Sequence, residues 1–183
     1  DGVHTVLGLI KDLRILRFEH LVRHFQRTAL LRHLRIEVME GRQAVQGALR
    51  RETIGSDRLS IVMPFFHLAA SVAKNLRQVA DLFESHGIPT ELVPVDDGSG
   101  DGTDQILRAF DSKAYRHVAM TPVVCPKNGG KGAALRAGFE ASSGRYVLLL
   151  DGDLDIHPAQ TPLFFESLVR NHSDIVVGSK RHP

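Results

Sequence analysis

Hydrophobic and polar residues follow two different patterns along this chain, and the pattern changes near residue 58. Before that point, apolar residues recur at three- to five-residue spacing from Leu13 to Val38, with arginines between them. This spacing predicts helix over about residues 3–50. The stretch TIGSDR, residues 53–58, predicts a linker after the helical part.

After residue 58, short apolar runs alternate with segments of helical periodicity. The runs are apolar on both faces, which is typical of strands buried between layers of helices. Strands are expected at residues 59–64, 90–97, 117–125, 145–151 and 174–179. Helices are expected between them at residues 68–86, 103–111, 132–142 and 159–171. This order predicts an α/β fold, a mostly parallel sheet with helices on both faces, preceded by an N-terminal helical extension.

Charge divides the chain at the same place. Residues 1–58 hold 11 Lys and Arg against 7 Asp and Glu, whereas residues 59–183 hold 12 against 14. We expect the basic first part to pack on its own domain or on a partner. The alternative is a helix lying on an anionic membrane surface, which would make the chain a peripheral membrane protein. No nucleic acid partner is expected, because no aromatic platform or known motif accompanies the arginines.

Cysteine usage and hydropathy limit the cellular location. A single cysteine, Cys125, excludes an internal disulfide framework and is typical of a reducing compartment. No apolar stretch reaches the roughly 20 residues needed to span a bilayer, and no signal peptide is visible. The sequence starts at Asp1 without Met, so a fragment or a processed chain is expected. We therefore expect a cytoplasmic location, or the cytoplasmic face of a membrane.

Unusual residues follow each of the expected strands. In a parallel sheet the ligand site lies beyond the carboxyl ends of the strands, so these segments are expected to meet at one edge. The first strand ends at Pro64, and the others lead into the sequences VDDGSGDGT, CPKNGGKG, DGDLD and GSKRHP.

The stretch VDDGSGDGT combines an acidic pair with glycines that permit a tight turn. A dinucleotide-binding loop is disfavoured because Asp96 and Asp97 would repel a pyrophosphate. An EF-hand is excluded because Arg108 stands where the loop requires a glutamate. Carboxylates at a strand end can instead accept hydrogen bonds from a base or a ribose. The alternative is a polar turn in which Asp101 or Thr103 caps the next helix.

The stretch NGGKG places glycines and Lys131 just before an expected helix. Free N–H groups and the helix dipole at such a position suit an anion, which favours phosphate binding. It is not a Walker A loop, because Gly132 replaces the required serine or threonine. The alternative is a glycine-rich turn with a solvated lysine.

Three carboxylates, Asp151, Asp153 and Asp155, directly follow the fourth expected strand. They repel one another unless a cation or strong donors lie among them. Ligands that are all oxygen favour Mg²⁺ or Mn²⁺, and an Asp-x-Asp pair beside a phosphate-binding loop suggests a metal–diphosphate complex. For Asp155 the alternative is a helix cap near Pro158. His157 is expected to be structural or solvated rather than a ligand.

Taken together, these motifs resemble family 2 glycosyltransferases of the GT-A fold over residues 59–183. The similarity is greatest to the branch that loads a sugar onto a polyprenyl phosphate, such as dolichyl-phosphate mannose or glucose synthases. It is carried by LSIVMPFF, VPVDDGSGDGT, NGGKGAALRAGFEASSG, LLLDGDLDIHP and DIVVGSK. The resemblance implies inverting transfer from a nucleoside-diphosphate sugar with a divalent metal. It also implies a lipid-phosphate acceptor.

The resemblance assigns expected roles to individual residues. Asp151 and Asp153 match the metal-binding pair on which catalysis depends, and Asp155 matches a third ligand. Substrate binding is expected from Pro64, Asp96, Asp97, Gly98, Lys131 and Lys180, with Lys180 as a diphosphate contact.

The chain also departs from the family pattern. FFHLAAS, residues 65–71, stands where relatives usually carry a Tyr-Asn-Glu sequence, so a carboxylate that helps hold the nucleotide is missing. The acceptor half, which follows the fifth strand in relatives, is missing as well. The expected domains are thus a basic extension with its linker, residues 1–58, and a nucleotide-sugar-binding half, residues 59–183. The alternatives are a binding fragment without catalysis and, less favoured, a sugar-phosphate nucleotidyltransferase.

Overall fold

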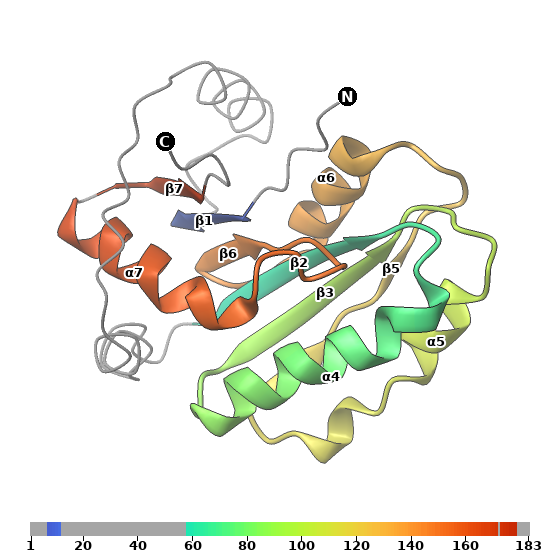
Figure 1. The fold of residues 1–183 in the computed structure, drawn as a ribbon, viewed down its shortest axis with the longest axis horizontal. Helices are drawn as coiled ribbons and strands as arrows, with labels where there is room; N and C mark the ends of the chain where they lie inside the picture. The colour runs from blue at the N-terminus through green and yellow to red at the C-terminus, as the bar shows by residue number, and fades with distance from the viewer. Residues whose placement is uncertain (1–6, 12–57, 172, 179–183) are drawn as a thin grey trace.

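The computed structural model describes residues 7–11, 58–171 and 173–178. They form one seven-stranded sheet in the order β4-β3-β2-β6-β1-β7, with β5 also paired to β3 (Figure 1). The strands are β1 (Leu7–Lys11), β2 (Leu59–Phe65), β3 (Thr90–Asp96), β4 (Val118–Met120), β5 (Val123–Val124), β6 (Tyr146–Leu149) and β7 (Ile175–Gly178). The helices are α4 (Ala69–Ser85), α5 (Thr103–Ala109), α6 (Lys131–Ala141) and α7 (Thr161–Arg170), with short 3₁₀ turns η1 (Ser112–Ala114) and η2 (Pro158–Gln160).

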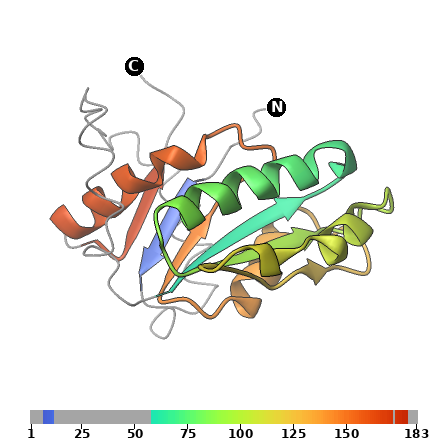
Figure 2. The ribbon, with the colours of Figure 1, turned by 90° about the horizontal axis from the view of Figure 1, so that it is seen from below.

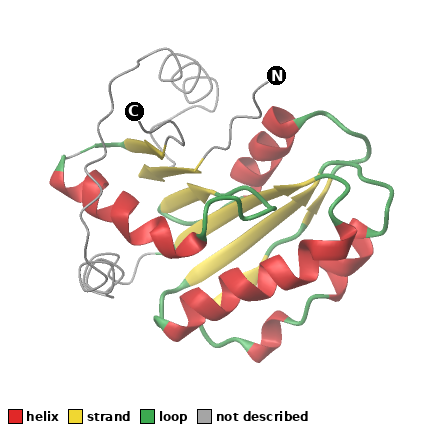
Figure 3. Ribbon diagram, in the orientation of Figure 1, coloured by secondary structure: helices red, strands yellow, loops and turns green. Residues whose placement is uncertain are grey.

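Helices cover both faces of the sheet, which confirms the predicted α/β architecture (Figure 3). On one face, the alternate residues Leu59, Ile61 and Met63 of β2 pack with the apolar sides of α4 and α7. On the other face, residues such as Val62 and Val95 pack with α6. Every residue of β3 is buried, as expected for a central strand covered from both sides.

The strand β1 corrects the sequence-based prediction for the first part of the chain. Helix was predicted over residues 3–50, but β1 is a strand that pairs antiparallel with both β6 and β7. It runs against its neighbours, as Figure 2 shows, so the sheet is parallel except at this strand. The helix prediction is therefore wrong for β1. The rest of the predicted extension falls on residues 12–57, outside the described residues, and the division at residue 58 stays a prediction.

Pro94 lies inside β3 without removing a hydrogen bond that the sheet needs. The carbonyls of Leu92 and Asp96 both accept bonds from the side of β3 that faces β4 and β5. Pro94 lies midway between them and shares their orientation, so its missing N–H faces the break between these two short strands. The expected third strand, residues 117–125, is accordingly split into β4 and β5 at Thr121 and Pro122.

Close packing of α6 on the sheet gives a first testable prediction. A Cβ on Gly138 would lie within 2.4 Å of Val62 Cγ1 and 2.8 Å of Val95 Cγ2. Gly138→Ala should therefore lower the free energy of unfolding by about 2 kcal/mol, because the helix would have to move away from the sheet. Gly132→Ala, in open space on the same helix, should instead raise it by up to about 1 kcal/mol. Thermal denaturation of both variants checks this; equal shifts would contradict it.

Candidate functional site

The loops that follow β2, β3, β5 and β6 gather beyond the carboxyl ends of these strands (Figure 3). The loop after β3 contacts the loop after β5 directly, since Asp97 Oδ1 accepts a hydrogen bond from the Gly129 N–H at 2.9 Å. Gly98 adopts φ +66°, and a Cβ there would lie 2.4 Å from the carbonyl carbon of Lys127. Only glycine fits both this conformation and this approach. The structure thus brings the two predicted loops to one edge.

Asp96 is buried at the end of β3 and closes its own turn. Its Oδ1 accepts hydrogen bonds from the Ser99 N–H at 3.1 Å and the Ser99 hydroxyl at 2.5 Å. The Ser99 hydroxyl oxygen also accepts a bond from the His67 N–H at 3.0 Å, which ties this turn to the end of β2. The neighbouring Cys125 is a poor nucleophile here: burial, then the charges of Asp97 and Asp96, raise the pKa of its thiol.

Asp101 shows the helix-terminal role that the sequence left as an alternative. Its Oδ1 accepts from the Thr103 N–H at 3.1 Å and the Thr103 hydroxyl at 2.6 Å. Its Oδ2 accepts from the Ala69 N–H at 3.2 Å, so one carboxylate serves the N-termini of α5 and α4. These donors, led by the Thr103 hydroxyl, lower the pKa of Asp101. Asp101 therefore fixes the loop after β3 to the first residues of α4 and α5.

Lys131 and Asp151 form an ion pair across the site. Lys131 is the first residue of α6, and its Nζ lies 2.5 Å from Oδ1 of Asp151, just after β6. The Asp151 side chain is 10% exposed and that of Lys131 is 37% exposed. A carboxylate with so little access to solvent is stabilised by a cation at close range. The predicted phosphate-loop lysine and the predicted metal-binding aspartate thus face each other.

Asp153 and Asp155 follow Asp151 in the same loop. Both are exposed, and Asp153 Oδ1 accepts a hydrogen bond from the Asp155 N–H at 3.1 Å, which forms a local turn. Within the described ranges, no group of three or more His, Cys, Asp or Glu side chains is arranged to hold a metal. The metal-binding roles of Asp151, Asp153 and Asp155 therefore stay predictions.

His157 has a structural role, as predicted. It is the N-cap of η2, where its Nδ1 accepts a hydrogen bond from the Ala159 N–H at 3.1 Å. Its Nε2 lies 2.8 Å from the side-chain amide of Gln78 on α4. The cap near Pro158 is thus His157, and the alternative that assigned this cap to Asp155 is wrong.

Pro64 lies beside the loop that carries the aspartates. A Cβ on Gly152 would lie 2.5 Å from the Pro64 carbonyl oxygen and 2.7 Å from the Phe65 ring, so the end of β2 and this loop are in contact. The prediction that Pro64 shares an edge with Asp151 is therefore confirmed in geometry, and its nucleotide-lining role stays a prediction. Lys180 falls outside the described residues.

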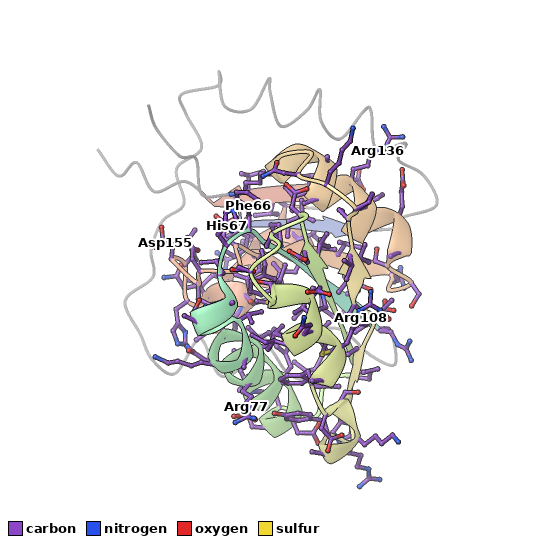
Figure 4. The ribbon with its side chains drawn as sticks, turned by 90° about the vertical axis from the view of Figure 1, so that its right-hand side faces the viewer. Phe66, His67, Arg77, Arg108, Arg136 and Asp155 are labelled. Atoms are coloured by element: carbon purple, nitrogen blue, oxygen red, sulfur yellow. The ribbon has the colours of Figure 1, made fainter. Side chains whose placement is uncertain are left out.

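Sequence patterns missed two features at this edge. Phe66 and His67 follow β2 as an exposed pair with ring centroids 4.0 Å apart, and Figure 4 shows them adjacent. The other is Asn75, a buried polar residue on the apolar side of α4, whose Nδ2 donates to the Gly152 carbonyl at 2.8 Å. Its position three residues after Val72 and four before Val79 was the available signal, because a polar residue in an apolar stripe needs a partner.

Comparison with known proteins identifies the family. The sequence profile described as "Glycosyl transferase family 2" matches residues 60–183, more than half of the chain. The chain therefore belongs to glycosyl transferase family 2.

Two curated relatives are similar over about seven tenths of the chain. A dodecaprenyl-phosphate galacturonate synthase from Rhizobium johnstonii is 32% identical over 131 residues, which cover 72% of this chain and 38% of the relative. An undecaprenyl-phosphate 4-deoxy-4-formamido-L-arabinose transferase from Pseudomonas paraeruginosa is 36% identical over 125 residues, which cover 68% and 36%. The chain thus spans less than two fifths of the length of either relative.

Among solved structures, a mannosyltransferase from Pyrobaculum calidifontis in complex with GDP-Man and Mn²⁺ is similar with a TM-score of 0.49. It is 19% identical, and the match covers 78% of this chain and 37% of that one.

In the described parts of the chain, no helix has both the length and the hydrophobicity required to cross a bilayer.

Proposed function

We propose that residues 59–183 bind a nucleoside-diphosphate sugar together with Mg²⁺ or Mn²⁺, as the donor half of an inverting glycosyltransferase. The observation that supports this best is the buried Asp151 carboxylate, which faces a cation where the loops of a family 2 domain converge. The names of the curated relatives support a polyprenyl phosphate as the acceptor. Such a lipid acceptor would place the reaction at a membrane surface, on its cytoplasmic face.

The residues at the site fit a hard divalent cation. Asp151 supplies a carboxylate oxygen with little solvent around it. In the structure the positively charged Lys131 Nζ lies beside this oxygen, where a metal cation would bind. Mg²⁺ usually binds one or two protein carboxylates and completes its shell with water and substrate phosphates, so a preformed cluster of three side chains is not required. When bound, the cation would neutralise charge on the leaving diphosphate.

Residues of the chain would then bind the nucleoside and the diphosphate. Asp96 and Asp97 would accept hydrogen bonds from the nucleoside. Lys131 would exchange Asp151 for the diphosphate and stabilise the negative charge that develops as the sugar leaves, and Lys180 would add positive charge to the same diphosphate. A phosphate acceptor is already ionised near neutral pH and would need no general base, whereas a hydroxyl acceptor would need one.

Titration of UDP-sugars and GDP-sugars into the chain by calorimetry tests the proposal. We expect saturable binding of one class in the presence of Mn²⁺ and its loss when EDTA removes the metal. Binding that ignores the metal, or no binding of either class, would overturn it. Metal-dependent binding without sugar transfer to a polyprenyl phosphate would support the alternative, a nucleotide-sugar-binding fragment. Pyrophosphate release from a nucleoside triphosphate and a sugar phosphate would indicate a nucleotidyltransferase instead.

A further inference from the structure

The loop between β6 and η2, residues 150–157, which we call the acidic loop, has a backbone that needs outside support. Leu154 adopts φ +57°, a left-handed conformation that is unfavourable for leucine. Its N–H donates to the Asp151 carbonyl at 3.0 Å, which closes a turn around Gly152 and Asp153. Strained conformations persist only where the surrounding structure fixes them. The backbone conformation of this loop therefore depends on the contacts that hold it.

Helix α4 supplies two side-chain contacts to the acidic loop, one near each end. Asn75 donates to the carbonyl of Gly152 at 2.8 Å, and Gln78, one turn later, contacts His157 at 2.8 Å. Asn75 is 8% exposed and lies among the apolar residues that anchor α4 to the sheet. A fixed helix therefore presents a rigid donor to the loop.

The Asn75 side chain contacts the acidic loop at the residue between two of its aspartates. Gly152 lies between Asp151 and Asp153, so holding its carbonyl fixes the peptide plane that joins Gly152 to Asp153 and restrains the backbone between the two aspartates. Gly152 is also in tight contact with the Pro64 carbonyl, which leaves the loop little room to shift toward β2. Without Asn75, the buried carbonyl of Gly152 would lose its partner and the loop would relax around the strained Leu154.

We infer that Asn75 is a positioning residue, which holds the backbone between Asp151 and Asp153 in the conformation that binds a divalent metal. This inference rests on the proposed function. Asn75 touches neither the metal nor the substrate. It acts through the Gly152 carbonyl, in the way that groups behind metal ligands orient those ligands and tune metal affinity.

Manganese affinity of the folded chain tests the inference without a transfer assay. Free Mn²⁺ is counted by its electron paramagnetic resonance signal during titration, in the presence of a saturating nucleoside diphosphate. We expect Asn75→Leu, which keeps the volume but lacks the donor, to bind Mn²⁺ about tenfold more weakly than wild type. Asn75→Ala serves as a second variant in case leucine does not fit, and the same loss is expected.

Val79→Ala is the matched control, because Val79 is buried on the same side of α4 and does not contact the acidic loop through a hydrogen bond. It should lower the melting temperature while leaving the Mn²⁺ dissociation constant within twofold of wild type. A folded Asn75 variant that binds Mn²⁺ within twofold of wild type would overturn the inference. Failure of the wild-type chain to bind Mn²⁺ would overturn the proposed function, and the inference with it.

Discussion

Asp151→Asn should weaken metal-dependent binding of the nucleoside-diphosphate sugar by about 100-fold or more, equivalent to roughly 2.7 kcal/mol. The amide keeps the shape of the side chain but removes the charge that attracts a divalent cation. It also removes the partner of Lys131, whose ammonium lies 2.5 Å from the carboxylate in the structure. Calorimetric titration with Mn²⁺ and the sugar nucleotide bound by wild type measures the effect.

Asp174→Asn provides the control for this prediction. Asp174 is an exposed carboxylate just before β7, so it lies at the amino end of that strand, at the opposite edge of the sheet from Asp151. Its replacement changes the net charge by the same amount and should leave binding within a factor of two. If Asp151→Asn bound as tightly as Asp174→Asn, the assignment of Asp151 to the metal would be wrong.

The sequence predicted the site where it depends on a general rule, that the carboxyl ends of parallel strands lie at one edge of the sheet. Buried apolar runs identified the parallel strands, and parallel strands necessarily bring their carboxyl ends together. That rule was enough to place Asp97 and Lys131 near each other and near Asp151. It did not predict the contacts themselves, because the Lys131–Asp151 pair and the Asn75–Gly152 bond depend on side-chain reach between segments far apart in the chain.

The strand β1 shows why the fold prediction failed where it did. Its sequence LGLIK lies beside a long stretch of helical periodicity, and five residues are too few for a pattern to distinguish a strand from a helix. The strand conformation of β1 depends on its partners, since β1 fills the position between β6 and β7 and pairs with both. Such pairing is non-local, and local propensity carries little information about it.

The second large effect is expected at Glu91, the second residue of β3, whose buried carboxylate lies away from the site. Its Oε2 accepts from the Ser60 hydroxyl at 2.6 Å and from the N–H and hydroxyl of Ser143 at 2.8 and 2.9 Å. Its Oε1 accepts from the Thr121 hydroxyl at 2.9 Å. One side chain thus joins β2, the segment after α6 and the connection between β4 and β5.

Glu91→Gln should lower the free energy of unfolding by about 3 kcal/mol, because an amide N–H₂ would face donors that lose their acceptor in a buried place. Thermal or urea denaturation measures the loss. Glu140→Gln is the matched control, since Glu140 is exposed and pairs with Arg136 along the helix surface at 2.8 Å. It should cost no more than about 0.5 kcal/mol. Similar losses for the two variants would show that the Glu91 network contributes little.

The effect of Glu91→Gln should also depend on pH. Burial raises the pKa of Glu91, but the hydrogen bonds from Ser60, Ser143 and Thr121 together outweigh it and leave the pKa below its usual value. A carboxyl whose pKa is lower in the folded state stabilises the fold above the unfolded-state pKa, about 4.3, and loses that contribution as the pH falls through the folded-state value. The stability difference between wild type and Glu91→Gln should therefore be constant from about pH 6 to 8 and shrink below about pH 4. A difference that stayed unchanged down to pH 3 would mean that the charged form of Glu91 is not what these donors stabilise.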